Sequence, residues 1–495
     1  VGGEPFLIVG VGYDTGTRPG QLPWTRPFQP EVLKKDFERI REAGFNTIRV
    51  WAPMTDEELD LAAEYGLWVI QALWIKPDAD FTDPEFQRQT YEFVEKEITR
   101  SAEHPNILFY HLLNEPHGNT VYEAGLDNVR AFYREMVAIA RRCDPKRFFS
   151  FSNCVSTDFM LPDMWDFVAQ NAYPYSPVTI EKALGYSTYL QLFRDKFTQG
   201  KPLVITEFGL SVSPRGDGRG YGGNTLEQQR DGVVRLWDSV IDADCAGGCA
   251  FMWIDGWQKY GDERTHNDHS EEWYGFLEAD TDFMGRPRPV YYALKEYNKA
   301  ILTQPRNGQV FADSIPVNVW APHLPRVQAS LEEGTWVDLT RQGEWLTGEL
   351  SSAGLSNGAC YVRTRGLDEQ GNAVSPKYRI VTVNRDNPQR PDEILVRLVD
   401  FPEKHPSDQP MPVVVKVTDL DGKPLAGRQV KIGRYLHTEW NEYYVEADTD
   451  GEGLARAELP ALNRAGIASV AAGVVHEHGL IRKTCGDYAH VELTP

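Results

Sequence analysis

ILFYHLLNE, residues 107–115, is a continuously apolar run that ends on an amide and a carboxylate. Strands buried on both faces of a parallel sheet have this pattern, whereas strands with one face in solvent alternate apolar and polar residues. Seven more runs of this type lie in the first 255 residues: FLIVGVG (6–12), TIRVW (47–51), WVIQAL (68–73), FFSFSN (148–153), FVAQNAY (167–173), PLVITEFG (202–209) and CAFMWID (249–255). The sequence therefore predicts eight strands of one parallel sheet.

Helical patterns separate these runs, at residues 31–43, 56–65, 84–103, 128–142, 185–198, 225–241 and 290–302. The connection 154–166 is the weakest, with at most one short helix around Met164 and Trp165. Eight strands and about eight crossovers in roughly 300 residues predict an α/β fold, a (β/α)8 TIM barrel over residues 1–305. An open doubly wound sheet is the alternative, but no glycine-rich phosphate loop follows the first strand.

The rhythm changes after about residue 304, where helical periodicity ends and short alternating strands with Gly-containing turns begin. We predict two all-β sandwich domains, 306–386 and 391–495, joined through the polar stretch NRDNPQRPDE (384–393). Within the second, Asp-Gly turns in 413–432 and 447–459 predict two strand-turn-strand units.

Composition limits the possible partners. The chain has 495 residues, with 51 Lys plus Arg against 72 Asp plus Glu, a net charge of −21. This charge opposes binding to nucleic acid or to an anionic membrane surface and suits a neutral substrate. No apolar run approaches the roughly 20 residues of a membrane-spanning helix, so we expect no membrane insertion. The six cysteines are too scattered for a disulfide framework or a zinc site, so mostly free or singly paired thiols are expected.

Two glutamates lie at the carboxyl ends of predicted strands. Glu115 ends the fourth strand and Glu207 ends the seventh. In a TIM barrel these ends surround one mouth, and the fourth and seventh strands lie almost opposite each other. Glycoside cleavage with retention needs two carboxyl groups about 5 to 5.5 Å apart, one as nucleophile and one as acid/base. The pair therefore predicts this chemistry.

LLNEP at the end of the fourth strand, ITEFG at the end of the seventh and the aromatic FMWIDGW in the eighth resemble the clan A retaining glycoside hydrolases. The similarity covers about residues 6–302, including the closing loop and last helix in 271–297. The resemblance implies that Glu115 is the acid/base and Glu207 the nucleophile. The C-terminal segment, with VTDLDGKPLAGRQV, resembles bacterial immunoglobulin-like modules, and the preceding sandwich resembles fibronectin-like ones.

The resemblance also implies roles for residues around the pair. Asn114 would bind the sugar 2-hydroxyl, while Arg49 and Tyr173 would hydrogen-bond the nucleophile. Trp253 would form the floor under the sugar. Stacking platforms for neighbouring sugars and one further contact complete the set of expected substrate-binding residues: Trp51, Trp74, Trp257 and His117.

No metal or other cofactor is expected. His111 and His117 flank the motif, but neither has a partner at metal-ligand spacing, so we interpret His111 as a hydrogen-bonded structural residue. The stretch DTDGEG (448–453) lacks the later bidentate Glu of a calcium loop and predicts a turn.

The expected function is retaining hydrolysis of a neutral poly- or oligosaccharide, with an endo-β-glucanase, acting for example on β-1,3-glucan, as the leading substrate hypothesis. A β-mannanase or β-galactosidase, a transglycosylase and a non-catalytic carbohydrate-binding scaffold are the alternatives. The surface-type modules favour a secreted, periplasmic or cell-surface location, although no signal peptide can be read in a chain that starts at Val1.

Overall fold

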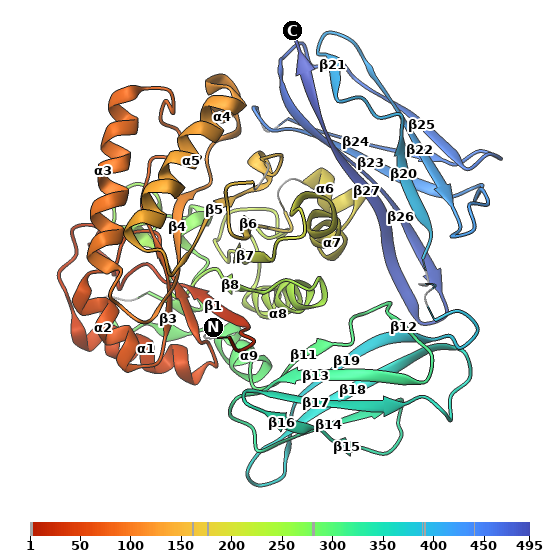
Figure 1. Cartoon of the computed structure of the whole chain (residues 1–495), viewed down its shortest axis with the longest axis horizontal. Coiled ribbons are helices and arrows are strands. Elements are labelled where there is room, and N and C mark those ends of the chain that lie inside the picture. Colours follow the sequence, from red (N-terminus) through yellow and green to blue (C-terminus); the bar gives the residue numbers. More distant parts are fainter. Residues whose placement is uncertain are drawn as a thin grey trace.

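A computed structural model describes residues 3–160, 163–175, 178–279, 283–388, 390, 393–439 and 441–495. The first part is the predicted TIM barrel (Figure 1), with eight parallel strands closed in chain order. The strands are β1 (Ile8–Gly12), β2 (Thr47–Arg49), β3 (Trp68–Ala72), β4 (Ile107–Asn114), β5 (Phe148–Asn153), β6 (Val168–Asn171), β7 (Leu203–Phe208) and β8 (Gly247–Ala250). The first seven match the predicted runs. The eighth starts two residues earlier than predicted and ends at Ala250.

Helices cover the outside of the barrel: α1 (Pro30–Glu42), α2 (Asp56–Glu64), α3 (Pro84–Ser101), α4 (Gly118–Ala124), α5 (Leu126–Cys143), α6 (Val178–Ala183), α7 (Tyr186–Phe197), α8 (Leu226–Asp242) and α9 (Pro289–Tyr297). Local signals explain several starts, since Pro occupies the first turn of α1, α3 and α9, and Thr55 and Thr225 form capping boxes for α2 and α8. The short helix expected around Met164 is absent from the described residues there; a 3-10 turn, η1 (Val155–Thr157), occurs instead, and residues 161–162 lie outside the described part.

Two pairs of all-β sheets follow the barrel. The first pair contains β11 (Ile301–Gln304), β12 (Val310–Phe311), β13 (Ser314–Trp320), β14 (Arg326–Leu331), β15 (Val337–Asp338), β16 (Thr340–Gln342), β17 (Trp345–Ser351), β18 (Gly358–Leu367) and β19 (Ala373–Val383). The first strand, β11, lies within the segment that the sequence assigned to the barrel. The inward side chains of the two sheets in this pair form a core of their own, as expected for sheets packed face to face.

The second pair contains β20 (Leu395–Val399), β21 (Lys404–Pro406), β22 (Met411–Thr418), β23 (Gln429–Leu436), β24 (Asn441–Asp448), β25 (Leu454–Leu459), β26 (Gly466–His478) and β27 (Ile481–Thr494). The two Asp-Gly stretches match the prediction only in part. Both form tight turns, at 419–423 and 450–454, and the first carries a short antiparallel bridge between Thr418 and Pro424, but the long strands on either side, β22 and β23 or β24 and β25, belong to opposite sheets. The predicted linker 384–393 includes residues 389, 391 and 392, which lie outside the described part.

The second sandwich leans against the barrel through β23, β26 and β27, which lie beside α6 and α7 (Figure 1). Five side chains of the two sandwiches belong to the same buried apolar cluster as the barrel: Ile301, Trp320, Tyr435, Ala471 and Tyr488. Close packing requires small residues here, because a Cβ on Gly473 would lie 1.9 Å from the Ala183 carbonyl oxygen. The barrel and the C-terminal sandwich are therefore in intimate contact.

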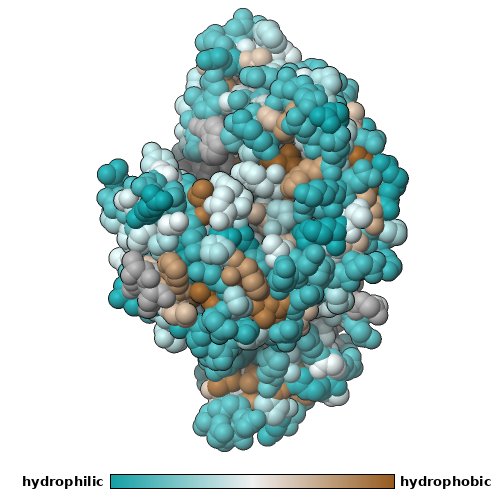
Figure 2. All heavy atoms as spheres, turned by 90° about the vertical axis from the view of Figure 1, so that its left-hand side faces the viewer, coloured by the Kyte–Doolittle hydropathy of each residue, from teal (hydrophilic) through white to brown (hydrophobic). Residues whose placement is uncertain are grey.

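The molecular surface agrees with the acidic composition. The face in Figure 2 is mostly hydrophilic, with hydrophobic residues in separate small patches. None of the helices in the described part of the chain combines the length and the apolar character needed to cross a bilayer.

Candidate active site

Glu207 is held at the end of β7 by one ion pair and two hydrogen-bond donors. Arg49 Nη1 lies 2.7 Å from Oε1 and Trp51 Nε1 donates to the same oxygen at 3.0 Å. The Tyr173 hydroxyl donates to Oε2 at 2.8 Å. Glu207 is only 5 % exposed, so these donors replace the water that an ionised carboxylate would otherwise need. The arrangement suits a carboxylate that stays charged and oriented, as a nucleophile must be.

Glu115 lies in a different environment at the end of β4. Its φ of 48° is in the left-handed region, which is uncommon for a residue with a side chain and is typical of functional sites. Asn171 Nδ2 donates to Oε1 at 2.9 Å. Burial, and second the negative charge of Glu207, raise the pKa of Glu115 to about 8. Glu115 therefore carries a proton near neutral pH and can act as a general acid.

A chain of polar side chains connects the two carboxyl groups. Arg49 Nη2 donates to Asn114 Oδ1 at 2.5 Å, and Asn171 Nδ2 lies 3.2 Å from the same oxygen. Since Asn171 also binds Glu115 and Arg49 also binds Glu207, Asn114 lies at the centre of the network. The predicted residues Arg49, Asn114 and Tyr173 are thus brought together around the glutamate pair.

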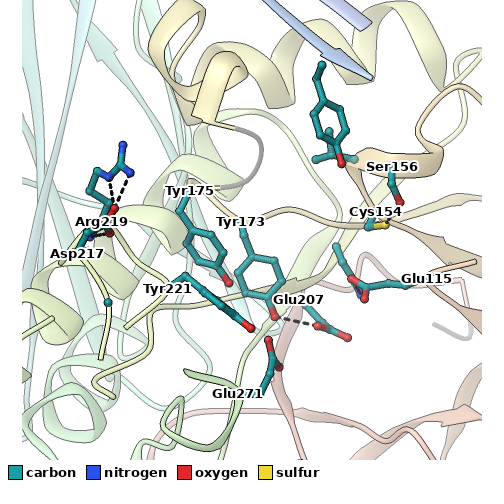
Figure 3. Close-up of a pocket in the computed structure, with 14 residues that line it drawn as sticks. Glu115, Cys154, Ser156, Tyr173, Tyr175, Glu207, Asp217, Arg219, Tyr221 and Glu271 are labelled. Atoms are coloured by element: carbon teal, nitrogen blue, oxygen red, sulfur yellow. Dashed lines mark hydrogen bonds and ion pairs between the residues drawn. The ribbon is translucent and has the colours of Figure 1, made fainter. Parts of the chain in front are cut away.

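A cavity of about 700 Å³ includes both glutamates in its wall (Figure 3). Its size is in the range of small-molecule sites, roughly 300–1,000 Å³. The wall contains Glu115, Cys154, Val155, Ser156, Asn171, Tyr173, Tyr175, Glu207, Gly216, Asp217, Arg219, Tyr221, Glu271 and Tyr435. The pair therefore faces a space that a sugar can enter.

Several of these residues were missed by the sequence analysis. Glu271 is a third carboxyl group, whose pKa is raised by burial, and it hydrogen-bonds Tyr221. Arg219 belongs to the glycine-rich loop PRGDGRGYGG after β7, and Tyr435 comes from β23 of the C-terminal sandwich. The loop follows a strand end, which is a usable signal, but nothing in the sequence indicates that Tyr435 reaches the barrel.

Two aromatic residues that we expected to contact sugar, the platform Trp51 and the floor Trp253, lie beneath the cavity surface. Trp51 is 7 % exposed, and the Arg49 guanidinium lies 4.0 Å from its ring centroid, so its indole serves Glu207. Trp253 is fully buried and packs edge-on against Tyr291 with 6.0 Å between ring centroids. Trp253 is not part of the cavity wall, although its backbone N–H still donates to Gly12 at the end of β1.

Phe251 is the aromatic residue of the eighth-strand segment that packs beside the residues binding Glu207. It packs edge-on against Trp51 and Tyr173, with 5.3 and 6.2 Å between the ring centroids. These rings form one apolar cluster with Tyr274 beside Glu207. The eighth-strand segment thus contributes an aromatic residue to this region, two positions before the one predicted.

Three other predicted contacts lie outside the cavity wall. Trp257 stacks on His266 with 5.1 Å between ring centroids. Trp74 is 49 % exposed and borders a separate pocket of about 670 Å³ together with Trp24. His117 is exposed just before α4. The structure therefore does not bring these residues to the glutamate pair.

His111 differs from the hydrogen-bonded residue that we expected. It is 1 % exposed, and neither ring nitrogen has a hydrogen-bond partner among the residues that the structure describes. Burial, with a further effect of Arg49, lowers its pKa well below the usual value, so the ring is neutral.

Comparison with known proteins agrees with this geometry. Residues 1–224 match the family described as "Glycosyl hydrolases family 2, TIM barrel domain". This match supports a clan A glycoside hydrolase domain. The curated relative "Beta-glucuronidase" from Mus musculus is 23 % identical over 256 residues, which are 49 % of this chain and 37 % of the mouse protein.

Solved structures similar to this chain include Bacteroides uniformis beta-glucuronidase 3, with 16 % identity, a TM-score of 0.48, and coverage of 99 % of this chain and 63 % of that one. Another is the GH2 beta-galacturonidase from Eisenbergiella tayi, with 23 % identity, a TM-score of 0.48, and coverage of 59 % and 51 %. The chain thus spans less than two thirds of the length of these proteins. The family match and the mouse relative support the predicted enzyme class, a retaining β-glycoside hydrolase.

Proposed function

We propose that this protein hydrolyses β-glycosidic bonds of a neutral oligo- or polysaccharide with retention of configuration. The observation that carries the proposal is that two carboxyl groups in the wall of one cavity have different surroundings. Glu207 pairs with the Arg49 guanidinium and accepts hydrogen bonds from Trp51 and Tyr173, whereas Glu115 has one amide donor and a pKa raised to about 8. Such a difference supports one nucleophile and one acid in the same cavity.

The reaction would proceed in two displacements. Glu207 attacks the anomeric carbon while Glu115 gives its proton to the departing oxygen, which leaves a glycosyl-enzyme ester and an ionised Glu115. Glu115 then takes a proton from water, whose oxygen attacks the same carbon and releases Glu207. Two inversions give net retention. Asn114 is close enough to the pair to bind the 2-hydroxyl during both steps.

The charge of the cavity supports a neutral substrate. Its wall contains four acidic residues, and among the described wall residues the one base is Arg219, whose Nε already donates to Asp217 at 2.6 Å. A uronic acid would bring a further negative charge among these carboxyl groups. The names of the relatives make a β-glucuronide the second candidate, with Arg219 as the residue that could receive its carboxylate.

A β-glucan is the first substrate to test, and we propose that the protein cleaves it at internal bonds. Trp51, Trp253 and Trp257 do not line the cavity, so the expected aromatic contacts for a long chain of sugars do not continue along its wall. A cavity of this size also suits short oligosaccharides. Sizing of the products from laminarin, mixed-linkage glucan and mannan decides between endo and exo action.

Aryl β-glycosides test the sugar and the stereochemistry. We expect the glucoside or mannoside to be cleaved faster than the glucuronide, and proton NMR to detect the β-anomer first. Cleavage of the glucuronide alone would refute the neutral-substrate proposal, and an α-anomer as first product would refute retention.

Azide rescue tests the residue roles. Glu207→Ala should restore turnover with azide and release an α-glycosyl azide, because azide then attacks from the vacated face. Glu115→Ala should lose about 10²–10⁴-fold in rate on a poor leaving group and release a β-glycosyl azide. Glu271→Gln is the matched control within the cavity and should form no azide product. An azide product from this control would show that the pair has been assigned wrongly.

A further inference from the structure

Asp158, His437 and His490 form a cluster where the C-terminal sandwich meets the barrel. Asp158 directly follows η1 in the barrel, His437 directly follows β23, and His490 lies in β27. Each offers one potential ligand atom, and these three atoms lie within 4.8 Å of one another. The cluster therefore joins two parts of the chain that are more than two hundred residues apart in sequence.

The cluster is buried and well ordered by hydrogen bonds. His490 Nε2 lies 2.7 Å from Asp158 Oδ1, while the other oxygen of Asp158 accepts bonds from the Tyr488 and Tyr189 hydroxyls at 2.6 and 3.1 Å. His437 Nε2 lies 2.5 Å from Ser469 Oγ. The side chain of Asp158 is fully buried and that of His490 is 15 % exposed.

We propose that this cluster is a zinc site that clamps the C-terminal sandwich to the barrel. Two imidazoles and one carboxylate are ligands that suit Zn²⁺, which takes three protein ligands plus water or a hydroxyl in a tetrahedral arrangement. Ser469 Oγ, adjacent to His437, is the candidate for the fourth position. The partly exposed edge of His490 provides the path of entry.

The surroundings supply the support that metal ligands need. The two tyrosine hydroxyls orient Asp158 through the oxygen that His490 does not use. The two ring nitrogens of His437 differ: Nδ1 makes no hydrogen bond of normal geometry within the described part of the chain, whereas Nε2 lies 2.5 Å from Ser469 Oγ. A proton on Nδ1 leaves Nε2 as the ligand atom.

Metal binding is a balanced exchange. The hydrogen on His490 Nε2 moves to Nδ1 by exchange with solvent when Zn²⁺ takes its place, so that Nε2 and Asp158 Oδ1 both donate electron pairs to the metal. No oxidant or reductant takes part.

The clamp would also shape the cavity. Val155 and Ser156 of its wall lie just before Asp158 in the chain, and the ring of Tyr435, another wall residue, lies 5.0 Å from that of His437. Zinc would therefore fix the wall opposite the glycine-rich loop without touching the reacting atoms. The expected kinetic effect is on KM, with little change in kcat.

The test uses the full chain after removal of metals with a chelator. Calorimetric titration with ZnCl2 should give one site, Co²⁺ should give the visible absorption of a four-coordinate ion, and zinc should raise the Tm. Asp158→Asn and His490→Gln should each weaken zinc binding by more than tenfold and abolish the zinc-dependent rise in Tm. These readouts need no activity and stay valid if the proposed glycosidase function fails.

His104→Gln is the matched control, because the His104 ring also lies between two carboxylates, 3.2 Å from Asp56 and 3.1 Å from Asp60, but outside the cluster. It should leave zinc stoichiometry unchanged. Absence of stoichiometric zinc binding to the unaltered chain overturns the proposal even if the variants fail to fold. Equal loss of Tm in His490→Gln with and without zinc also overturns it, since a hydrogen-bonded interface alone would behave in that way.

Discussion

Asn171 allows the protonation of the proposed acid to be shifted in a defined direction. Its Nδ2 donates to Glu115 Oε1 at 2.9 Å, and its Oδ1 accepts a hydrogen bond from Thr206 at 2.7 Å. The donated hydrogen bond favours ionised Glu115 and so opposes burial and the charge of Glu207, which raise its pKa to about 8. Asn171→Ala removes the donor, and the pKa of Glu115 should therefore rise further.

The size of this shift follows from the energy of the lost bond. A hydrogen bond to a charged group contributes about 1.5–3 kcal/mol. Since 1.36 kcal/mol corresponds to one pKa unit, the pKa of Glu115 should rise by about 1 to 2 units. Glu115 must be protonated to act as the acid, so activity falls as the pH rises through its pKa. The alkaline limb of the pH profile should move to higher pH in Asn171→Ala, even though the maximal rate falls.

The assay is kcat/KM from about pH 5 to about pH 10 on a β-glycoside with a poor leaving group. A dinitrophenyl glycoside serves as the internal comparison, because its leaving group departs without a proton and the limb should flatten. Gln170→Ala is the matched variant, since this neighbouring amide lies 3.3 Å from the Tyr189 hydroxyl and does not contact Glu115. A limb that stays in place or moves to lower pH in Asn171→Ala would refute the reasoning.

Two further predictions concern stability. Arg288→Met should lower the free energy of unfolding by about 3–5 kcal/mol, because Arg288 binds both oxygens of the buried Asp255 at 2.7 and 2.8 Å and its loss leaves that charge unpaired; an unchanged Tm in calorimetry would contradict this. Gly473→Ala should lower the Tm and raise KM, because its Cβ would meet the Ala183 carbonyl oxygen at 1.9 Å and push the sandwich off the barrel. Gly451→Ala, with nothing within 4 Å of its Cβ, is the control and should leave both values unchanged.

The barrel could be predicted because its strands are buried on both faces, so that each leaves a continuous apolar run such as 107–115. The exception is β8, where the first two residues of Gly247–Ala250 are glycines without an apolar signal. The apolar residues that follow pair irregularly: Met252 N–H donates to the Tyr274 carbonyl, whereas the residues on either side still donate to β7 and β1. Hydrophobicity alone could not locate that boundary.

The meeting of Glu115 and Glu207 at one mouth was predictable for a related reason. Residues at strand ends are fixed by the backbone of the barrel, which places Glu115, Glu207, Arg49 and Tyr173 within reach of one another. The tryptophans were not predictable in this way, because an aromatic residue at the rim can point to the cavity or to the core. The place of Tyr435 in the cavity wall could not be predicted from the sequence, since it depends on how a separate sandwich packs on the barrel.

The apolar cluster that Tyr435 and Tyr488 share with the barrel has a consequence for how the protein unfolds and evolves. Modules joined only by a flexible linker melt separately and can be exchanged between proteins. Here, separation would expose buried aromatic rings and remove part of the cavity wall. We therefore expect calorimetry to record one cooperative transition for the barrel and the C-terminal sandwich, and the sandwich to be inherited together with its barrel.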